Sequence, residues 1–148
     1  MGKFLKDINL KNKVAVVTGA TKGIGRATAI ALHQVGANII AIGRNQRELN
    51  TLRKKLKTKI KIFSCDVNDY EKIKKIIYGL NRVDILVNNA GTNLPEPFLN
   101  VKKSSLETLL NVNTKSAFNM AKLCTDKMLK MRNRKKIGGS IIHTSSMF

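Results

Sequence analysis

The chain has 148 residues, 43% of them hydrophobic, which is enough for one globular domain with a buried core. Its formal net charge is +19, from 28 lysines and arginines against 9 acidic residues, so a nucleic-acid or membrane-surface partner has to be considered. No apolar run approaches the roughly 18 residues that a membrane span needs, and the cations at 127–136 have no aromatic residue among them for base stacking. The composition favours a solvated basic surface, with no membrane partner and no specific nucleic-acid partner.

The cysteines and the N-terminus indicate a cytoplasmic protein. Cys65 and Cys124 are too far apart to form a metal-binding pattern or a disulfide framework, so we expect two reduced thiols in the core and no metal site. Residues 1–6 contain no apolar signal core, and Lys6 stands where a myristoylation motif has Ser or Thr.

Strand and helix signals alternate along the chain. Asn45 and Asp69 are expected to cap helices, and Ser104 to cap a long helix with Glu107 at the capping-box position. The predicted strands are 14–17, 38–42, 60–64, 84–87 and 140–145, and the predicted helices are 24–35, 45–56, one from residue 69 and one from 104 to the Gly138-Gly139 pair, with a loop at 93–103. This alternation predicts an α/β fold, a Rossmann-type doubly wound parallel sheet with ligands at the carboxyl ends of its strands.

The segment between the first strand and the first helix is the most informative one. Gly19, Gly23 and Gly25 follow the spacing G-x-x-x-G-x-G, whereas the common dinucleotide fingerprint is G-x-G-x-x-G. Three glycines at a helix start let the backbone approach a pyrophosphate, and the free N–H groups and the helix dipole then face its charge. Glycines also form ordinary tight turns, so this segment needs support from the rest of the chain.

Two cations bear on the choice of cofactor. Lys22 lies inside the glycine loop, and Arg44 directly follows the second strand, where no acidic residue is present. In dinucleotide folds an acid at that place holds the ribose 2′-hydroxyl, while an arginine accommodates a 2′-phosphate. The sequence therefore favours NADP over NAD, although in so basic a chain both residues can also be surface cations.

Polar residues follow the later strands. Asp66, which precedes Val67, could accept a hydrogen bond from an adenine amine or close a turn. The run Asn88-Asn89-Ala90-Gly91 after the fourth strand could tie neighbouring strands together and let a cofactor ring lie close, or form a plain turn.

Asn113, Ser146 and His143 complete the candidates. Asn113 stands in the apolar stripe of the long helix, where a buried amide left unpaired costs roughly 1–3 kcal/mol, so we expect it to bind a backbone carbonyl or a water, or to act as a structural anchor. Ser146 ends the fifth strand at the mouth of the cleft, where its hydroxyl could bind a substrate carbonyl. His143 lies in a buried strand pattern and is expected to be a core histidine.

From about Leu10 to the last residue, the order and spacing of these motifs resemble the short-chain dehydrogenase/reductase family. The resemblance implies that the glycine loop holds the cofactor pyrophosphate, Asp66 contacts adenine and Asn89 lies near the ribose. It also implies that Asn113 supports a water in a proton relay and that Ser146 orients the substrate oxygen while hydride passes between nicotinamide and a carbonyl or alcohol carbon. The implied cofactor-binding positions are Gly19, Thr21, Lys22, Gly23, Ile24, Gly25, Arg44, Asp66, Val67, Asn89, Ala90 and Gly91.

The chain departs from the family at its end. Family members carry a Tyr-x-x-x-Lys pair after the serine, whereas this chain ends at Phe148, and Tyr70 and Tyr78 belong to an earlier helix. We therefore expect residues 1–148 to be a dinucleotide-binding Rossmann domain that is incomplete at its C-terminus, a fragment inactive on its own. A dead remnant that binds dinucleotide weakly and a basic nucleic-acid-binding module are the alternatives. Sugars or polyols, 3-oxoacyl thioesters and simple ketones all stay open as substrates, with 3-oxoacyl reductases and gluconate or xylulose dehydrogenases as comparable relatives. A homo-oligomer is expected for full-length members, and the state of this chain is left open.

Overall fold

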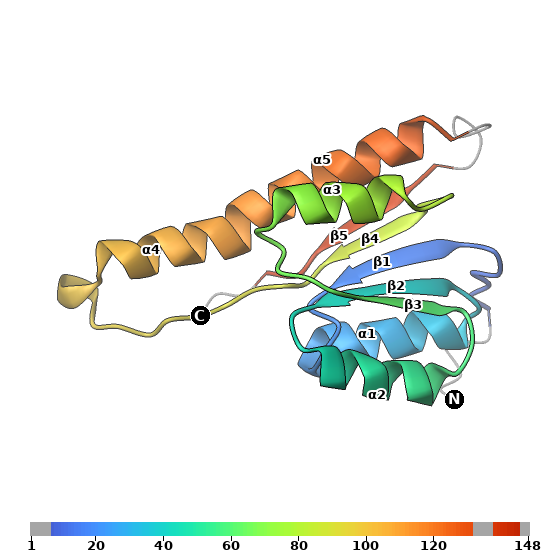
Figure 1. Cartoon of the computed structure of the whole chain (residues 1–148), viewed down its shortest axis with the longest axis horizontal. Helices are drawn as coiled ribbons and strands as arrows, with labels where there is room; N and C mark the ends of the chain where they lie inside the picture. Colours follow the sequence, from blue (N-terminus) through green and yellow to red (C-terminus); the bar gives the residue numbers. More distant parts are fainter. Residues whose placement is uncertain (1–6, 132–137, 146–148) are drawn as a thin grey trace.

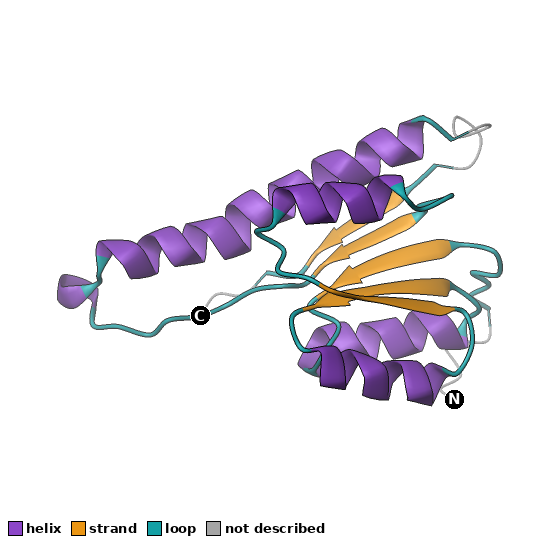
Figure 2. Cartoon of the chain, viewed as in Figure 1, coloured by secondary structure: helices purple, strands orange, loops and turns teal. Residues whose placement is uncertain are grey.

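In the computed structural model, which describes residues 7–131 and 138–145, five parallel strands form one sheet with helices on both faces (Figures 1 and 2). The strand order is β3-β2-β1-β4-β5. The strands are β1 Val14–Thr18, β2 Asn38–Gly43, β3 Ile60–Ser64, β4 Ile85–Asn88 and β5 Ser140–His143. The helices are α1 Gly23–Gln34, α2 Gln46–Leu56, α3 Tyr70–Tyr78, α4 Lys103–Leu110 and α5 Ser116–Leu129. The predicted doubly wound fold is confirmed, and β5 ends two residues before its predicted end.

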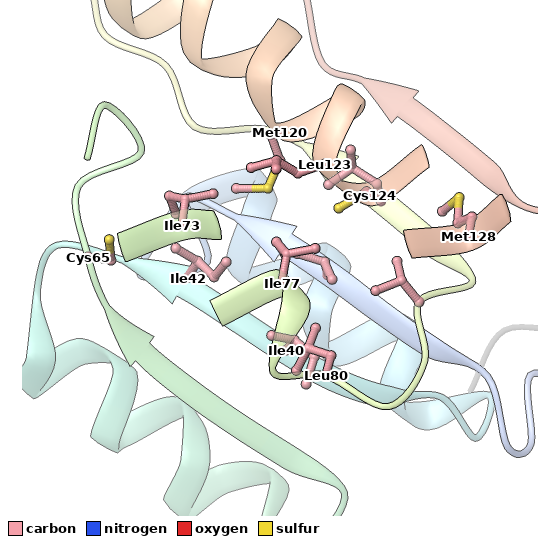
Figure 3. Packing of buried hydrophobic residues seen from close by; sticks show 13 residues of the cluster. Ile40, Ile42, Cys65, Ile73, Ile77, Leu80, Met120, Leu123, Cys124 and Met128 are labelled. Atoms are coloured by element: carbon pink, nitrogen blue, oxygen red, sulfur yellow. The ribbon is translucent and has the colours of Figure 1, made fainter. Parts of the chain in front are cut away.

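The central strands are apolar because both of their faces are buried. Val16 of β1 pairs with Ile40 of β2 on one side and with Leu86 of β4 on the other. One core lies between the sheet and helices α3 and α5, and Figure 3 shows Ile42 of β2, Ile77 of α3 and Met120 of α5 within it. The other core lies between the sheet and helices α1 and α2, where Ile39, Leu49 and Leu52 are fully buried.

Both cysteines are buried free thiols, as predicted. Cys124 is fully buried, and this burial raises the pKa of its thiol to about 12. Burial also raises the pKa of Cys65.

Two of the three predicted helix caps are confirmed. The side chain of Asn45 accepts a hydrogen bond from the backbone N–H of Glu48 at 3.1 Å, and Asp69 accepts one from the N–H of Lys72 at 3.1 Å. The prediction that Ser104 opens the long helix is wrong, because α4 begins at Lys103. The carboxylate of Glu96, from the preceding loop, accepts from the backbone N–H of Lys102 at 2.9 Å and from the Ser105 hydroxyl at 3.0 Å, so Ser104 is drawn into the first turn.

The long helix is interrupted in a way that the sequence pattern did not predict. A π-helical turn, Asn111–Lys115, separates α4, which has no buried residue, from α5. The buried residues of α5 are Ser116, Met120, Leu123, Cys124 and Met128. Leu106 and Leu110, which belong to the apolar stripe of the predicted long helix, are 49% and 53% exposed, because α4 extends beyond the sheet (Figure 1).

β5 forms one edge of the sheet, and all four of its residues are exposed. The prediction of a core histidine is therefore wrong. His143 is exposed, and its ring nitrogen Nδ1 lies 3.3 Å from the side-chain nitrogen of Asn88. Of the helices in the described part of the chain, none is long and apolar enough to cross a membrane.

Candidate functional site

The carboxyl ends of β1 and β4 lie side by side, and a buried hydroxyl fastens them. Thr18 ends β1 and is 2% exposed. Its side-chain oxygen accepts hydrogen bonds from the backbone N–H groups of Asn89 and Ala90, both at 3.0 Å, and donates to the carbonyl of Val87 at 3.3 Å. One hydroxyl thus ties the glycine loop to the turn after β4. Sequence reasoning missed Thr18, although a hydroxyl residue at the end of an apolar strand was the available signal.

Asn89 strengthens the same junction with its side chain. Its amide donates to the carbonyl oxygens of Thr18 at 3.2 Å and of Gly19 at 3.5 Å. A Cβ at Gly25 would lie 2.5 Å from the Gly19 carbonyl oxygen and would also collide with the Asn89 amide. The start of α1 therefore packs so closely on the loop that only glycine fits at position 25.

The N-terminus of α1 is open toward solvent. Lys22 is its N-cap residue and makes no side-chain cap hydrogen bond. Gly23 has a φ of +55°, and a Cβ there would meet nothing within 4 Å. Ile24 is 66% exposed. An uncapped helix start of this kind presents backbone N–H groups and the positive end of the helix dipole, which together suit an anion.

Thr21 and Arg26 hold the loop against α2. The methyl carbon of Thr21 fills the space over Gly43, since a Cβ there would lie 2.6 Å from it. The Arg26 guanidinium donates to the carbonyl of Thr21 at 3.3 Å and, from its other nitrogen, to the hydroxyl of Thr51 at 2.9 Å. Sequence reasoning missed Arg26, because nothing in its spacing separates it from the other cations of this chain.

Arg44 and Asp66 lie at the ends of neighbouring strands. The guanidinium of Arg44 is 78% exposed and lies 3.9 Å from the carboxylate of Asp66. Asp66 also accepts from the backbone N–H of Asn68 at 2.9 Å, so it closes the turn in which half-buried Val67 lies. The structure thus brings together one candidate for a 2′-phosphate and one for an adenine.

Asn113 is exposed, so the expectation of a buried amide in a core stripe is wrong. The π-helical turn that contains it lies against Thr92, past the carboxyl end of β4. Its side chain nevertheless binds backbone, because its oxygen accepts from the N–H of Thr92 and its nitrogen donates to the carbonyl of Thr92, both at 2.9 Å. These two bonds hold the segment after Gly91 against the long helix.

Of the remaining candidates, one ends β4 and one lies outside the described residues. Asn88 donates to the carbonyl of Ala117 at 2.9 Å, which ties β4 to α5. Ser146 lies outside the described residues, and Ser145, just before it, is exposed.

Neither tyrosine of α3 belongs to this junction. Tyr70 and Lys74 have the Tyr-x-x-x-Lys spacing, but the lysine nitrogen lies over the tyrosine ring, 6.0 Å from its centre. Tyr78 donates to the carboxylate of Asp126 at 2.8 Å, and this hydrogen bond raises the pKa of Tyr78.

Comparisons with known proteins find relatives over nearly the whole chain. The family model for short chain dehydrogenase matches residues 13–148. Carbonyl reductase (NADPH) 2 of Sus scrofa is 36% identical over 140 residues, which are 95% of this chain and 55% of that protein. The 3-oxoacyl-(acyl-carrier-protein) reductase of Thermotoga maritima is 34% identical over 95% of this chain and 58% of its own length. The crystal structure of serine dehydrogenase from Escherichia coli superposes with a TM-score of 0.80 and 31% identity, over 90% of this chain and 62% of that one. The chain thus spans a little over half the length of these relatives.

Proposed function

Since this chain belongs to the short-chain dehydrogenase family, we propose that the carboxyl ends of its strands bind NADP(H) for an oxidoreductase reaction. When bound, this cofactor supplies or accepts the hydride that moves to or from the carbonyl or alcohol carbon of a small substrate. The observation that carries the proposal is the uncapped N-terminus of α1 behind a loop that Thr18 and Asn89 hold in place. Oxidoreductase names among the relatives, one of which includes NADPH, support it.

The proposed contacts follow from the geometry of the junction. Backbone N–H groups at Gly23 and Ile24 hold the diphosphate, because they are uncapped and the space beside Gly23 is open. Asp66 and Val67, which follow β3, are proposed to contact the adenine. Asn89, Ala90 and Gly91, which follow β4, are proposed to contact the ribose and the nicotinamide ring.

NADP is favoured over NAD because β2 is followed by a cation and not by an acid. Arg44 is exposed, and its weak 3.9 Å contact with Asp66 leaves most of its guanidinium donors available for a 2′-phosphate. Lys22 in the glycine loop adds a second positive charge.

We assign Ser146 to the substrate oxygen and Asn113 to the support of a water on the proton path, as in the family. No Tyr-x-x-x-Lys pair follows Ser146 in this chain, so the chain by itself is proposed to bind dinucleotide without turnover. We place the protein in the cytoplasm, where its two buried thiols stay reduced.

The cofactor proposal is tested by calorimetric titration of the purified chain with NADPH and with NADH. We expect NADPH to bind about tenfold more tightly than NADH, and we expect Arg44→Asp to abolish or invert this ratio. Arg47→Asp, the same change at an exposed position in the first turn of α2, is the control and keeps the ratio. No binding of either nucleotide at millimolar concentration would reject the proposal, and an unchanged ratio in Arg44→Asp would exclude Arg44.

The proposed lack of turnover is tested by following NADPH oxidation with sugars, 3-oxoacyl thioesters and simple ketones. Steady oxidation that disappears in Ser146→Ala would show that this chain is complete enough for catalysis.

A further inference from the structure

Six cations crowd the amino end of β3. They are Arg53, Lys54, Lys55, Lys57, Lys59 and Lys61, which we call the basic edge. All six are exposed, and they occupy the last turn of α2, the turn that follows it and the start of β3. No acidic residue occurs between Glu48 and Asp66, so the sequence supplies no local neutralising charge.

None of the six forms an ion pair within residues 7–131 and 138–145, where the ion pairs are formed by other lysines and arginines. Ordinary structural roles account for part of the edge. Cations in the last turn of a helix interact favourably with the negative end of the helix dipole, which explains Arg53, Lys54 and Lys55. A lysine on an edge strand blocks pairing with other sheets, which explains Lys61. Lys57 and Lys59 are left without such an explanation.

The backbone at these two lysines is strained. Lys57 has φ 61° and ψ −58°, and the N–H of Thr58 donates to the carbonyl of Leu56 at 2.7 Å. This is a γ-turn with positive φ, the rarer and more strained of the two forms. Lys59 has a φ of 55°, and its carbonyl accepts from Ile39 at 2.7 Å. Glycine would adopt both conformations with less strain, so folding alone gives no reason for a lysine at either place.

The basic edge lies at the opposite end of the sheet from the glycine loop, because the strands are parallel and the edge surrounds the start of β3 (Figure 1). The basic edge is therefore separate from the proposed cofactor site.

We propose that the basic edge binds the phosphate backbone of nucleic acid without preference for sequence. Exposed lysines and arginines without acidic partners suit a line of phosphates, and the edge contains no aromatic residue that could stack on bases. An acidic membrane is the less favoured partner, because membrane-surface elements add exposed apolar side chains to their cations. Here Leu56 is buried and Ile60 is half-buried.

The test measures fluorescence anisotropy of a labelled, mixed-sequence DNA duplex over a range of salt concentrations. The unaltered chain is expected to bind at low salt, with log affinity falling steeply against log salt. The double variant Lys57→Gly/Lys59→Gly is expected to bind at least about tenfold more weakly, with a log–log slope shallower by about 2, while its melting temperature is unchanged or raised. Lys57→Arg/Lys59→Arg is expected to bind like the unaltered chain, which separates charge from backbone strain.

The matched control is Lys115→Ala/Lys122→Ala, which removes two exposed cations from the long helix. It is expected to keep most of the affinity. An equal loss in this control would overturn the proposal, because the overall charge of the chain would then explain binding. Absence of duplex binding at low salt would overturn it too, as would tighter binding to phosphatidylserine vesicles that the Gly variant abolishes.

Discussion

β1 and β4 are fastened to each other at both ends, but by different chemistry. At the carboxyl end, neutral groups do this: the Thr18 hydroxyl and the Asn89 amide bind backbone. At the amino end a carboxylate does it: Asp84, 4% exposed, accepts from Val14 N–H at 2.9 Å and from two nitrogens of Arg82 at 2.6 and 2.7 Å. Among the residues that the structure describes, the junction that faces the proposed diphosphate has no buried anion, so the positive end of α1 is not neutralised there.

The charged end is expected to be the more sensitive to a single substitution. Asp84→Ala removes a buried carboxylate and leaves the Val14 N–H and the Arg82 guanidinium without this partner, so we expect a loss of about 3 kcal/mol in the free energy of unfolding. Urea denaturation measures it. Glu107→Ala removes the acid of an exposed ion pair with Lys103 and serves as the control, with little change expected. Equal effects of the two substitutions would show that burial of Asp84 does not matter.

The two ends should also differ in their response to acid. Burial on its own would raise the pKa of Asp84, but hydrogen bonds from Arg82 and Val14 and the charges of Arg82 and Lys13 bring that pKa below its ordinary value. The stability from Asp84 is therefore fully present above the ordinary aspartate pKa of about 4 and is lost as pH falls through the lower folded-state pKa. The stability gap between the unaltered chain and Asp84→Asn should be constant from neutral pH down to about 5 and shrink below 4. Denaturation curves at several pH values measure this gap, and a constant gap down to pH 2 would contradict the shift.

At the carboxyl end of β1 and β4, stability and cofactor binding are expected to be sensitive to an added methyl group. In Gly25→Ala the new methyl group collides with the Gly19 carbonyl and the Asn89 amide, so we expect a loss of about 2 kcal/mol in stability and loss of NADPH binding. Thermal unfolding and calorimetry measure the two effects. Ala29→Gly, which removes a methyl from the same helix, is a control for helix weakening and should retain the binding. Normal NADPH affinity in Gly25→Ala would contradict the close packing at this helix start.

The smallest loss of stability is expected at the exposed hydrogen bonds between Asn113 and Thr92. Asn113→Ala removes two hydrogen bonds to Thr92, but both are exposed, so a loss of about 1 kcal/mol is expected. Amide hydrogen exchange at Thr92 is the more direct measurement and should become faster. Asn119→Ala on α5 is the control, and unchanged exchange in Asn113→Ala would show that water replaces the amide without loss.

Local signals in the sequence predicted the strands, the glycine loop and the caps at Asn45 and Asp69, because each depends on neighbours within a few residues. The helix start at Lys103 could not be predicted in this way, since Glu96 supplies the acceptor from the preceding loop. Asn113 was misplaced because a π-helical turn breaks the period on which its burial was inferred. His143 was misplaced because an apolar strand pattern does not say whether another element covers it. The roles in cofactor and substrate binding stay predictions.

Burial of Cys124 gives the protein an internal reporter. Thiolates react and thiols do not, and a thiol with a pKa of about 12 forms almost no thiolate at neutral pH. Alkylating reagents will therefore modify this side chain only during moments when α5 lifts from the sheet. The rate at which Cys124 is labelled, followed separately from Cys65, would measure how often α5 separates from the sheet in the unmutated protein, without an attached probe.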